Sequence, residues 1–402
     1  MFSRNSSPEI LAITDALPPL KGGATAYTYH AILGMSAPVL VLCPFGSDQP
    51  GESVQVKRVF YTNFQIKSRS LRKVYSLCLY LQMALIPLIW ACRFRKSLKV
   101  VMCFQVAPAG VAGYLIHRIF GIPFGVVTYG EELTISLRKR VLGLRLHKWL
   151  MSLIISDAAR VVTISEFTRS KLVHFRSKQG RVALIYPGIR VPQSVEPSKR
   201  ILQMLNGRVL SNTRIVLMAG RLIERKGFDY AIRAFTELRK EYEDLCLVIA
   251  GTGEMEESLK GYVRQEGDTG DVIFVGAVSD NELHFLYSIC KLFLLPTRTL
   301  EDGDTEGFGI VFIEAGAHGK AVIAGRTGAT PEAVVDGVTG VLIDGKSTTE
   351  IGNALRAVLG DPDFAQRLGR EGRKRVARDF SVERQQREFR RLVEGLLEQA
   401  DG

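Results

Sequence analysis

Two basic residues in the second half of the chain have the types and the setting that anion binding would need. Arg221 and Lys226 lie in the segment AGRLIERKGFDY, between an apolar run that ends at Gly220 and a predicted helix that begins near Phe228. A guanidinium, an ammonium and the free backbone N–H groups of a helix start together favour an anion such as a diphosphate. A solvated basic loop is the alternative for this segment taken alone.

Two carboxylates follow in the segment TEGFGIVFIEAG. Glu306 and Glu314 have seven residues between them. A helix that begins near Gly309 would leave Glu306 in the preceding loop and place Glu314 about one turn inside the helix. The two carboxylates would then contact different parts of one bound molecule. Solvated surface glutamates are the commoner case, but the glycines around Glu306, which let the backbone approach a ligand, favour a binding site.

Two further turns contain candidate residues. Gly251 and Gly253 follow an apolar run, but a dinucleotide-binding fingerprint would need a third glycine where the chain has Glu256. What remains is a tight turn into a helix, either a plain turn or one that lets a nucleoside approach closely. The DGD sequence at 302–304 has the letters of a metal motif, but its setting favours a glycine-rich surface turn. No metal site is predicted.

The elements that must position these residues alternate between short apolar runs and longer helical stretches. This pattern indicates an α/β fold with parallel sheets, in which ligands bind at the carboxyl ends of the strands. The predicted strands are residues 10–14, 39–44, 99–104, 124–130, 159–165 and 182–188, then 214–220, 245–251, 271–276, 291–297, 321–325 and 340–344. Three prolines between residues 186 and 200 predict an extended linker. We therefore expect domains at 1–190 and 191–380, with a final helix at 381–402.

Charge is divided unevenly along the chain. Residues 1–190 contain 25 Lys and Arg against 8 Asp and Glu, an excess of +17, whereas residues 191–402 contain 28 against 33, or −5. Such asymmetry predicts a basic surface on the first half that faces an anionic membrane or a phosphate-bearing substrate. No zinc-finger spacing, RNP-like motif or basic region with heptads is present, so a nucleic-acid partner is not expected. A generally positive soluble surface is the plainer alternative.

Composition indicates the compartment. Hydrophobic residues make up 46% of the chain and charged residues 23%, as in soluble globular proteins. The six cysteines form no C-x-x-C pair, so reduced thiols are expected rather than disulfides or zinc. The N-terminal segment has no apolar core of a secretory signal, which favours a cytoplasmic protein.

One apolar run raises the question of a membrane. Residues 74–92 carry no formal charge, and basic residues flank the run at both ends. A run of this length could span a bilayer as a helix. Pro87, which would kink or end the helix, and Gln82 in mid-run disfavour a span. A helix packed on the first domain is preferred, and a helix with one face in a membrane interface is the alternative.

The ordered segments AGRLIERKG, AGTGE and EGFGIVFIEAGAHGKAVIAGRTGATPEAV resemble glycosyltransferase family 4, with the E-x7-E element at Glu306 and Glu314. The resemblance is strong over residues 214–345 and weaker in KGGATAY, TYGEEL, ISEFTRSKL and IYPGI of the first half. Members are retaining, sugar-nucleotide-dependent group 1 glycosyltransferases, including enzymes similar to phosphatidylinositol mannosyltransferases. The resemblance implies the GT-B fold: two doubly wound Rossmann-like domains that face a central cleft, with a C-terminal helix that crosses back to the first domain.

The resemblance also implies roles for individual residues. Arg221 and Lys226 would bind the donor diphosphate, Glu306 would contact the transferred sugar, and all three would be catalytic. The implied donor-binding residues are Gly22, Gly23, Arg221, Lys226, Gly251, Gly253, Val278, Gly307, Phe308, Gly309, Ile310 and Glu314. Many relatives carry a histidine-glycine pair where this chain has Tyr129-Gly130, so the group that replaces that histidine is an open question. Tyr129, Gly130 and Glu131 are candidate sugar or acceptor contacts, with capping or solvation as the alternative for Glu131.

The expected function is transfer of a sugar, with retention and without a metal or other cofactor. The donor would be a nucleotide-diphospho-sugar, and the acceptor a lipid-linked or cell-envelope glycan at the cytoplasmic membrane face. The basic, apolar character of the first half favours this acceptor. The alternatives are a soluble small-molecule acceptor on the same fold and a non-catalytic protein that binds sugar nucleotides or acts as a scaffold.

Overall fold

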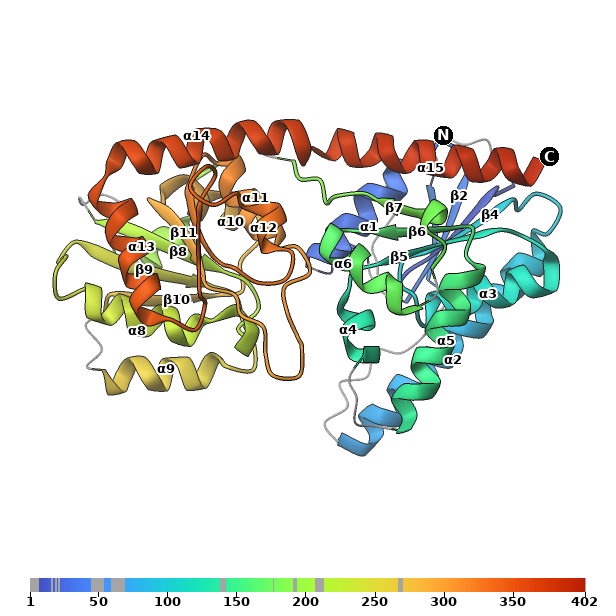
Figure 1. Cartoon of the computed structure of the whole chain (residues 1–402), viewed down its shortest axis with the longest axis horizontal. Coiled ribbons are helices and arrows are strands. Elements are labelled where there is room, and N and C mark those ends of the chain that lie inside the picture. The colour runs from blue at the N-terminus through green and yellow to red at the C-terminus, as the bar shows by residue number, and fades with distance from the viewer. Residues whose placement is uncertain are drawn as a thin grey trace. The chain divides into compact units, whose positions relative to one another are not determined.

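The computed structural model describes residues 7–15, 17–18, 20, 22–44, 54–58, 69–137, 142–175, 177–190, 194–206, 213–266 and 270–401. The chain forms two compact units (Figure 1). Unit 1 comprises Met1–Gly188 and Val382–Gly402, and unit 2 comprises Ile189–Ser381. Each unit is built on one parallel sheet, as the alternation of apolar runs and helical stretches predicts.

Unit 1 contains a seven-stranded sheet in the order β3-β2-β1-β4-β5-β6-β7. Its strands are β1 (Ile10–Ile13), β2 (Val39–Cys43), β3 (Val54–Arg58), β4 (Val100–Cys103), β5 (Phe124–Thr128), β6 (Arg160–Thr163) and β7 (Val182–Leu184). Its helices are α1 (Gly23–Leu33), α2 (Arg69–Arg93), α3 (Ala109–Phe120), α4 (Glu131–Leu137), α5 (Leu142–Asp157), α6 (Glu166–Lys171) and α15 (Val382–Asp401). Every described pairing between neighbouring strands is parallel.

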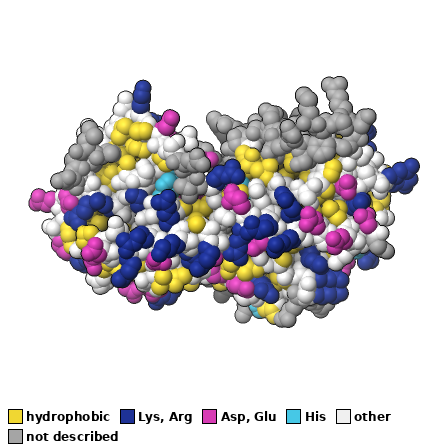
Figure 2. Space-filling model, turned by 90° about the horizontal axis from the view of Figure 1, so that it is seen from above, with side chains coloured by type: hydrophobic (Ala, Val, Ile, Leu, Met, Phe, Trp, Pro, Cys, Tyr) yellow, Lys and Arg dark blue, Asp and Glu magenta, His cyan; other side chains and the backbone are white. Residues whose placement is uncertain are grey.

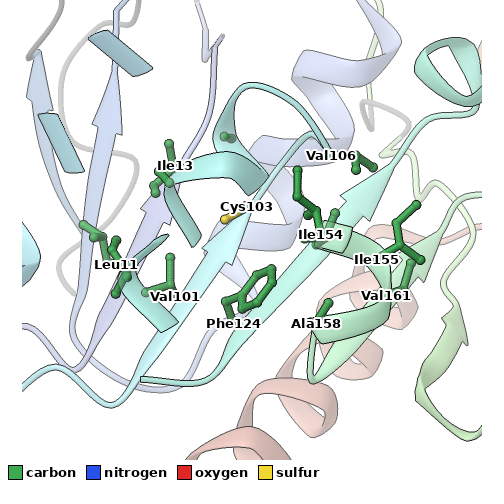
Figure 3. Packing of buried hydrophobic residues seen from close by; sticks show 14 of the residues in the cluster. Leu11, Ile13, Val101, Cys103, Val106, Phe124, Ile154, Ile155, Ala158 and Val161 are labelled. Atoms are coloured by element: carbon green, nitrogen blue, oxygen red, sulfur yellow. The ribbon is translucent and has the colours of Figure 1, made fainter. Parts of the chain in front are cut away.

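Apolar side chains from the strands and from α3 and α5 form the core on one side of this sheet. Figure 3 shows part of this cluster, with Val101 and Cys103 from β4 and Phe124 from β5 close to Ile154 from α5. All four side chains are fully buried. Burial of an aliphatic or aromatic side chain stabilises a fold by roughly 1.5–3 kcal/mol, so this cluster is what holds α3 and α5 on the sheet.

Unit 2 contains a six-stranded sheet in the order β10-β9-β8-β11-β12-β13. Its strands are β8 (Arg214–Ala219), β9 (Leu245–Ala250), β10 (Val272–Gly276), β11 (Leu292–Leu295), β12 (Ala321–Gly325) and β13 (Val341–Ile343). Its helices are α7 (Lys199–Met204), α8 (Phe228–Leu238), α9 (Glu256–Gln265), α10 (Asp280–Ile289), α11 (Ile310–Ala317), α12 (Thr330–Ala333), α13 (Thr348–Gly360) and α14 (Pro362–Asp379). The strand order reverses between β8 and β11, which in such sheets is the place where ligands bind.

The structure differs from the sequence prediction at two places. Strand β3 was not predicted, because its sequence VQVKR alternates apolar and polar residues and lacks the continuous apolar run of the other strands. Pro87 was expected to kink or end this helix; α2 continues through Pro87 to Arg93, so the helix does not end there. No helix among the described residues is both long and apolar enough to cross a membrane.

Helix α2 has one buried and one exposed face. Met83, Ala84 and Ala91 are buried, and Met83 and Ala91 belong to the unit 1 core. Between residues 78 and 92 the exposed side chains are Cys78, Leu81, Leu85, Ile89 and Cys92, which we call the α2 stripe. The spacing of three or four residues places all five on one side of the helix. The side chains of residues 69–77, including the basic residues before the apolar run, lie outside the described part of the structure.

Basic side chains are not confined to the half of the chain with the excess of positive charge. Figure 2 shows the face that carries α14, where Lys and Arg side chains are numerous. On α14, five basic side chains are exposed: Arg367, Arg370, Arg373, Lys374 and Arg378. A count by halves of the sequence therefore does not by itself locate an anion-binding surface.

The buried side chain of Gln385 forms two hydrogen bonds that help to fix helix α15 to unit 1. The Gln385 carbonyl oxygen accepts a hydrogen bond from the Gly188 N–H at 2.8 Å, and its amide donates to the Tyr27 carbonyl at 2.9 Å. The Tyr27 hydroxyl in turn donates to the Ile185 carbonyl at 3.0 Å, and its ring packs against Phe389. Gln385 thus satisfies two backbone groups that no water reaches.

We expect Gln385→Ala to lower the free energy of unfolding of unit 1 by about 2–4 kcal/mol, because both backbone groups would lose their partners in a buried place. Chemical unfolding followed by circular dichroism measures this change. Glu394→Ala, which removes an exposed side chain from the same helix, is the control. An equal loss in both variants would contradict the role given to Gln385.

Candidate active site

The predicted anion-binding lysine and the first predicted carboxylate form a buried ion pair at the switch point of the unit 2 sheet. Lys226 follows β8, and Glu306 follows β11. The Lys226 ammonium donates to Glu306 Oε2 at 2.6 Å. Lys226 is 9% exposed and Glu306 is 7% exposed. The sequence indicated both residues but not their contact.

Backbone contacts fix the two loops that carry this ion pair. The Glu306 carbonyl accepts a hydrogen bond from the Ala329 N–H at 3.0 Å. Gly227, directly after Lys226, has a φ of +73°, and a Cβ there would lie 2.0 Å from the Pro296 carbonyl oxygen. Glycine is therefore required at 227, where the two loops touch. The side chains of Lys226 and Glu306 are consequently held on rigid backbone.

Sequence reasoning missed Arg225, which joins the same ion pair. Its guanidinium donates to Glu306 Oε2 at 3.2 Å and lies 3.4 Å from Asp304 Oδ2. Burial opposes ionisation of Glu306, but the charges of Lys226 and Arg225 outweigh it and hold the pKa of that carboxyl below its ordinary value. Arg225 stands next to Lys226 in the motif ERKG, and the adjacent positive charge was the signal that could have identified it.

A buried arginine, Arg298, supports the loop of Arg225. The Arg298 guanidinium forms two hydrogen bonds with the Asp229 carboxylate, at 2.7 and 3.1 Å. The backbone N–H of Arg298 donates a hydrogen bond to the backbone carbonyl of Arg225 at 2.8 Å. Arg298 therefore links the strand end after β11 to the loop after β8.

Arg221, the second basic residue of the prediction, does not join this cluster. Its side chain is exposed, and no ion pair or hydrogen bond from it to another described side chain is present. It lies in the same loop as Lys226, at the end of β8. A guanidinium in this state is available to an anion from solution.

Glu314 lies in the second turn of α11 and binds a tyrosine rather than a cation. The Tyr287 hydroxyl, fully buried on α10, donates to Glu314 Oε2 at 3.0 Å. Desolvation raises the pKa of Glu314 to about 7, and the hydrogen bond from Tyr287 opposes this rise. Tyr287 was not predicted, because it lies on a different helix with no motif around it.

A pair of histidines holds the ring of this tyrosine. The His318 ring stacks on Tyr287, with centroids 5.4 Å apart, and its Nε2 lies 2.9 Å from Nδ1 of His284. Burial, and to a lesser degree the neighbouring His284, lower the pKa of His318 to about 4. The pair is therefore neutral at physiological pH, with one imidazole as donor and the other as acceptor.

The glycines predicted for close ligand approach are explained in part by packing. A Cβ at Gly251 would lie 1.9 Å from the Gly220 carbonyl oxygen, and a Cβ at Gly253 would lie 2.3 Å from that of Leu222. The loops after β8 and β9 touch at these positions. A structural requirement therefore accounts for both residues whether or not a nucleoside binds beside them.

The segment before α11 presents backbone rather than side chains. Gly309 is the N-cap residue of α11 and has a left-handed backbone conformation, so no side chain caps this end of the helix. Ile310 is the first helical residue. The Phe308 side chain is buried against Phe380 and is not free to contact a ligand. Gly307 is half-buried beside it. Val278, half-buried, lies in the loop between β10 and α10.

The unit 1 candidates lie at the carboxyl ends of β1 and β5. The Tyr129 hydroxyl is 2.5 Å from Thr28 Oγ1, and that threonine donates its own proton to the Ala24 carbonyl. Since a threonine hydroxyl has one proton, Tyr129 is the donor in this pair. The Tyr129 hydroxyl thereby links the end of β5 to α1. This helix begins at Gly23, and its N-cap residue, Gly22, provides no side-chain capping hydrogen bond.

The two glutamates after this tyrosine differ in their surroundings. Gly130, with a φ of +93°, leads into α4. Glu131 is exposed in the first turn of α4. The Val106 N–H approaches the Glu132 carboxylate at 3.4 Å, and desolvation raises the pKa of Glu132 to about 7.

Within the described ranges, no group of three or more His, Cys, Asp or Glu side chains could hold a metal ion. The DGD sequence at 302–304 forms a turn in which the Asp302 carboxylate accepts a hydrogen bond from the Asp304 N–H at 3.0 Å. The carboxylate of Asp304 faces Arg225.

The sequence matches two family models. Glycosyltransferase Family 4 covers residues 21–191, and Glycosyl transferases group 1 covers residues 206–375. The GDP-mannose-dependent alpha-(1-6)-phosphatidylinositol monomannoside mannosyltransferase of Mycolicibacterium smegmatis is 31% identical over 69% of this chain and 71% of that protein. This chain belongs to glycosyltransferase family 4. The resemblance inferred from the motifs is thus confirmed.

Further similarities support the fold of this family 4 glycosyltransferase. The alpha-D-kanosaminyltransferase of Streptomyces kanamyceticus is 25% identical over 73% of this chain and 78% of that protein. The crystal structure of Anabaena HepE in complex with UDP and glucose matches 97% of this chain and 99% of that chain, with a TM-score of 0.74 and 18% identity. At that identity the likeness concerns the fold, and the predicted GT-B fold with its two Rossmann-like domains is confirmed.

We expect Tyr287→Phe to raise the pKa of Glu314 above its present value near 7, by about one pH unit, because the ionised carboxylate would lose its hydrogen bond. An NMR titration of carboxyl-labelled glutamate measures the midpoint. Tyr262→Phe, which removes a hydroxyl elsewhere in unit 2, is the control. An unchanged midpoint in Tyr287→Phe would show that the hydrogen bond does not tune this group.

Proposed function

We propose that this glycosyltransferase transfers a sugar from a nucleotide-diphospho-sugar to a lipid-linked or cell-envelope glycan at the cytoplasmic face of a membrane. We further propose that the transfer proceeds with retention of configuration and without a metal ion. The observation that carries the proposal is the buried cluster of Lys226, Arg225 and Glu306 at the switch point of the unit 2 sheet. The similarity to a mannosyltransferase with a phosphatidylinositol monomannoside acceptor supports the choice of acceptor class.

The chemistry of transfer explains why cations are needed here. When the bond between the anomeric carbon and the leaving oxygen breaks, positive charge develops on the sugar and negative charge on the diphosphate. In this proposal, Lys226, Arg225 and the exposed Arg221 would stabilise that negative charge. Preorganised cations in a buried site lower a barrier by several kcal/mol, because they need not reorganise during the reaction.

The carboxylates have separate tasks in this proposal. Glu306 Oε1 has no hydrogen-bond partner in the described part of the chain, so this oxygen is available to a hydroxyl of the transferred sugar. Glu314, one turn into α11, would accept hydrogen bonds from the ribose hydroxyls. The free N–H groups at the start of α11 would contact the sugar or the phosphates.

We expect Lys226→Ala to lower the rate of sugar transfer about 100-fold, because the leaving diphosphate would lose its buried cation. Lys240→Ala, which removes the same charge from an exposed position in unit 2, should leave the rate within twofold. The assay is release of the nucleoside diphosphate in the presence of acceptor. Equal rates in the wild type and Lys226→Ala would refute the assigned site.

A panel of donors identifies the substrates. UDP-, GDP- and ADP-sugars, GDP-mannose among them, are incubated with the enzyme with and without a bacterial lipid extract, and transfer of labelled sugar into the organic phase is measured. Label that enters only water-soluble products would favour a soluble acceptor. Binding of a nucleotide sugar without turnover under any condition would favour a non-catalytic protein.

The α2 stripe supports location at a membrane. Leu81, Leu85 and Ile89 are 49%, 51% and 68% exposed on a helix whose other face is packed on the unit 1 core. The segment from residue 53 to residue 130 contains no Asp or Glu, while exposed basic side chains follow the stripe at residues 93–96. An apolar face beside cations suits an anionic lipid surface. Two copies of the stripe would bring like charges together, which disfavours self-association.

We expect the double variant Leu85→Glu, Ile89→Glu to reduce partition into anionic vesicles at least tenfold, because two apolar contacts would be replaced by charges that anionic lipid repels. Co-sedimentation with phosphatidylglycerol vesicles at low salt measures this. The control is Val338→Glu, at an exposed apolar residue of unit 2. Unchanged partition would exclude the stripe as the membrane contact, and a dimer that the double variant dissolves would assign the stripe to a second copy.

A further inference from the structure

The cations proposed to bind the donor already have partners of opposite charge. Lys226 and Arg225 both contact Glu306, and Arg225 also lies beside Asp304. Two cations face two carboxylates, so the formal charge of the cluster is zero. A site built only to attract a diphosphate would keep its cations unpaired, as Arg221 is.

Both cations contact the same oxygen of the glutamate. The Lys226 ammonium lies 2.6 Å and the Arg225 guanidinium 3.2 Å from Glu306 Oε2. The groups are nearly buried, so their attraction is weakly screened. A diphosphate cannot draw full benefit from these cations while Oε2 retains them. Binding of the donor therefore requires an exchange of partners.

The surroundings confine this exchange to side chains. The loop of Glu306 is fixed by the hydrogen bond from Ala329, and the loop of Lys226 is fixed by the contact between Gly227 and Pro296. The Glu306 carboxylate can leave the cations by rotation about its own side-chain bonds. No rearrangement of the backbone is needed.

We propose that Glu306 and the donor diphosphate compete for Lys226 and Arg225, so that Oε2 of the carboxylate leaves these cations when a diphosphate takes them. This inference rests on the proposed function of the site. It gives Glu306 a second role: the charge of its carboxylate makes the site select ligands with enough negative charge to displace it from the cations. A diphosphate replaces the carboxylate on both cations, whereas a single phosphate group with less charge replaces it poorly.

The test is the affinity of Glu306→Gln for inorganic pyrophosphate, measured by isothermal titration calorimetry of the full chain. Glutamine keeps the size of the side chain but removes the competing charge. We expect pyrophosphate to bind about tenfold more tightly than to the wild type, and the preference over inorganic phosphate to fall. Transfer of sugar should decrease in the same variant, because the contact with the sugar is weakened.

Two further variants make the test specific. Glu301→Gln removes one negative charge from an exposed position in the same loop, and its affinity should stay within twofold of the wild type. Asp304→Asn removes the other partner of Arg225 from a partly exposed position and should tighten pyrophosphate binding about threefold. Asp304→Asn keeps the test decisive if Glu306→Gln proves too unstable to titrate.

The outcomes separate this inference from the proposed function. Unchanged or weaker binding of pyrophosphate by Glu306→Gln and Asp304→Asn, together with loss of binding in Lys226→Ala, would overturn the competition and leave the donor site intact. If Lys226→Ala binds pyrophosphate as well as the wild type, the donor site itself is wrongly placed.

Discussion

The buried contact between Lys226 and Glu306 is the interaction on which the unit 2 site depends. Two opposite charges that leave water are stable only if they remain paired in good geometry, since removal of one partner strands the other. The switch point of the sheet meets this requirement, because the loops after β8 and β11 begin on neighbouring strands. The order of strands therefore decides which side chains can meet, although the two residues are 80 positions apart in the sequence.

Contacts between the loops around this ion pair fix the positions of its two side chains. The glycine after Lys226 lets its loop touch the end of β11, and Arg298 joins the same two loops through a backbone hydrogen bond. These contacts involve backbone atoms and buried charges, which have few alternative arrangements. The same principle applies at Glu314, where a fully buried tyrosine and a stacked histidine leave the carboxylate one orientation. Glu306 lies in a loop and Glu314 in a helix, yet each carboxylate is held by buried partners.

The sequence revealed the strands and the motifs more readily than the contacts. Twelve apolar runs predicted twelve strands, because strands of a covered parallel sheet are buried on both faces and leave an unbroken apolar signature. Strand β3 lies at the edge of its sheet and carries polar residues, so that signature is missing. The catalytic candidates were visible as charged residues beside glycines. Tyr287 and Thr28 were not, because their roles arise from side-chain packing between elements that are distant in sequence. Arg225 was visible beside Lys226, but its contact with Glu306, 81 positions away, was not.

Helix α2 has apolar residues on two faces, one packed on the unit 1 core and one exposed. Its apolar run is long enough to span a bilayer. Successive residues point to different sides of a helix, however, and Met83 and Ala91 are buried in the unit 1 core. Among the described side chains between residues 78 and 92, those of the α2 stripe are the exposed ones. Packing uses part of the apolar surface that a membrane span would need, and what is left is a narrow face. A narrow apolar face on a folded domain supports reversible contact with the surface of a bilayer rather than insertion through it. For the proposed transfer from a water-soluble donor to a lipid-linked acceptor, reversible contact of this kind would give access to both substrates.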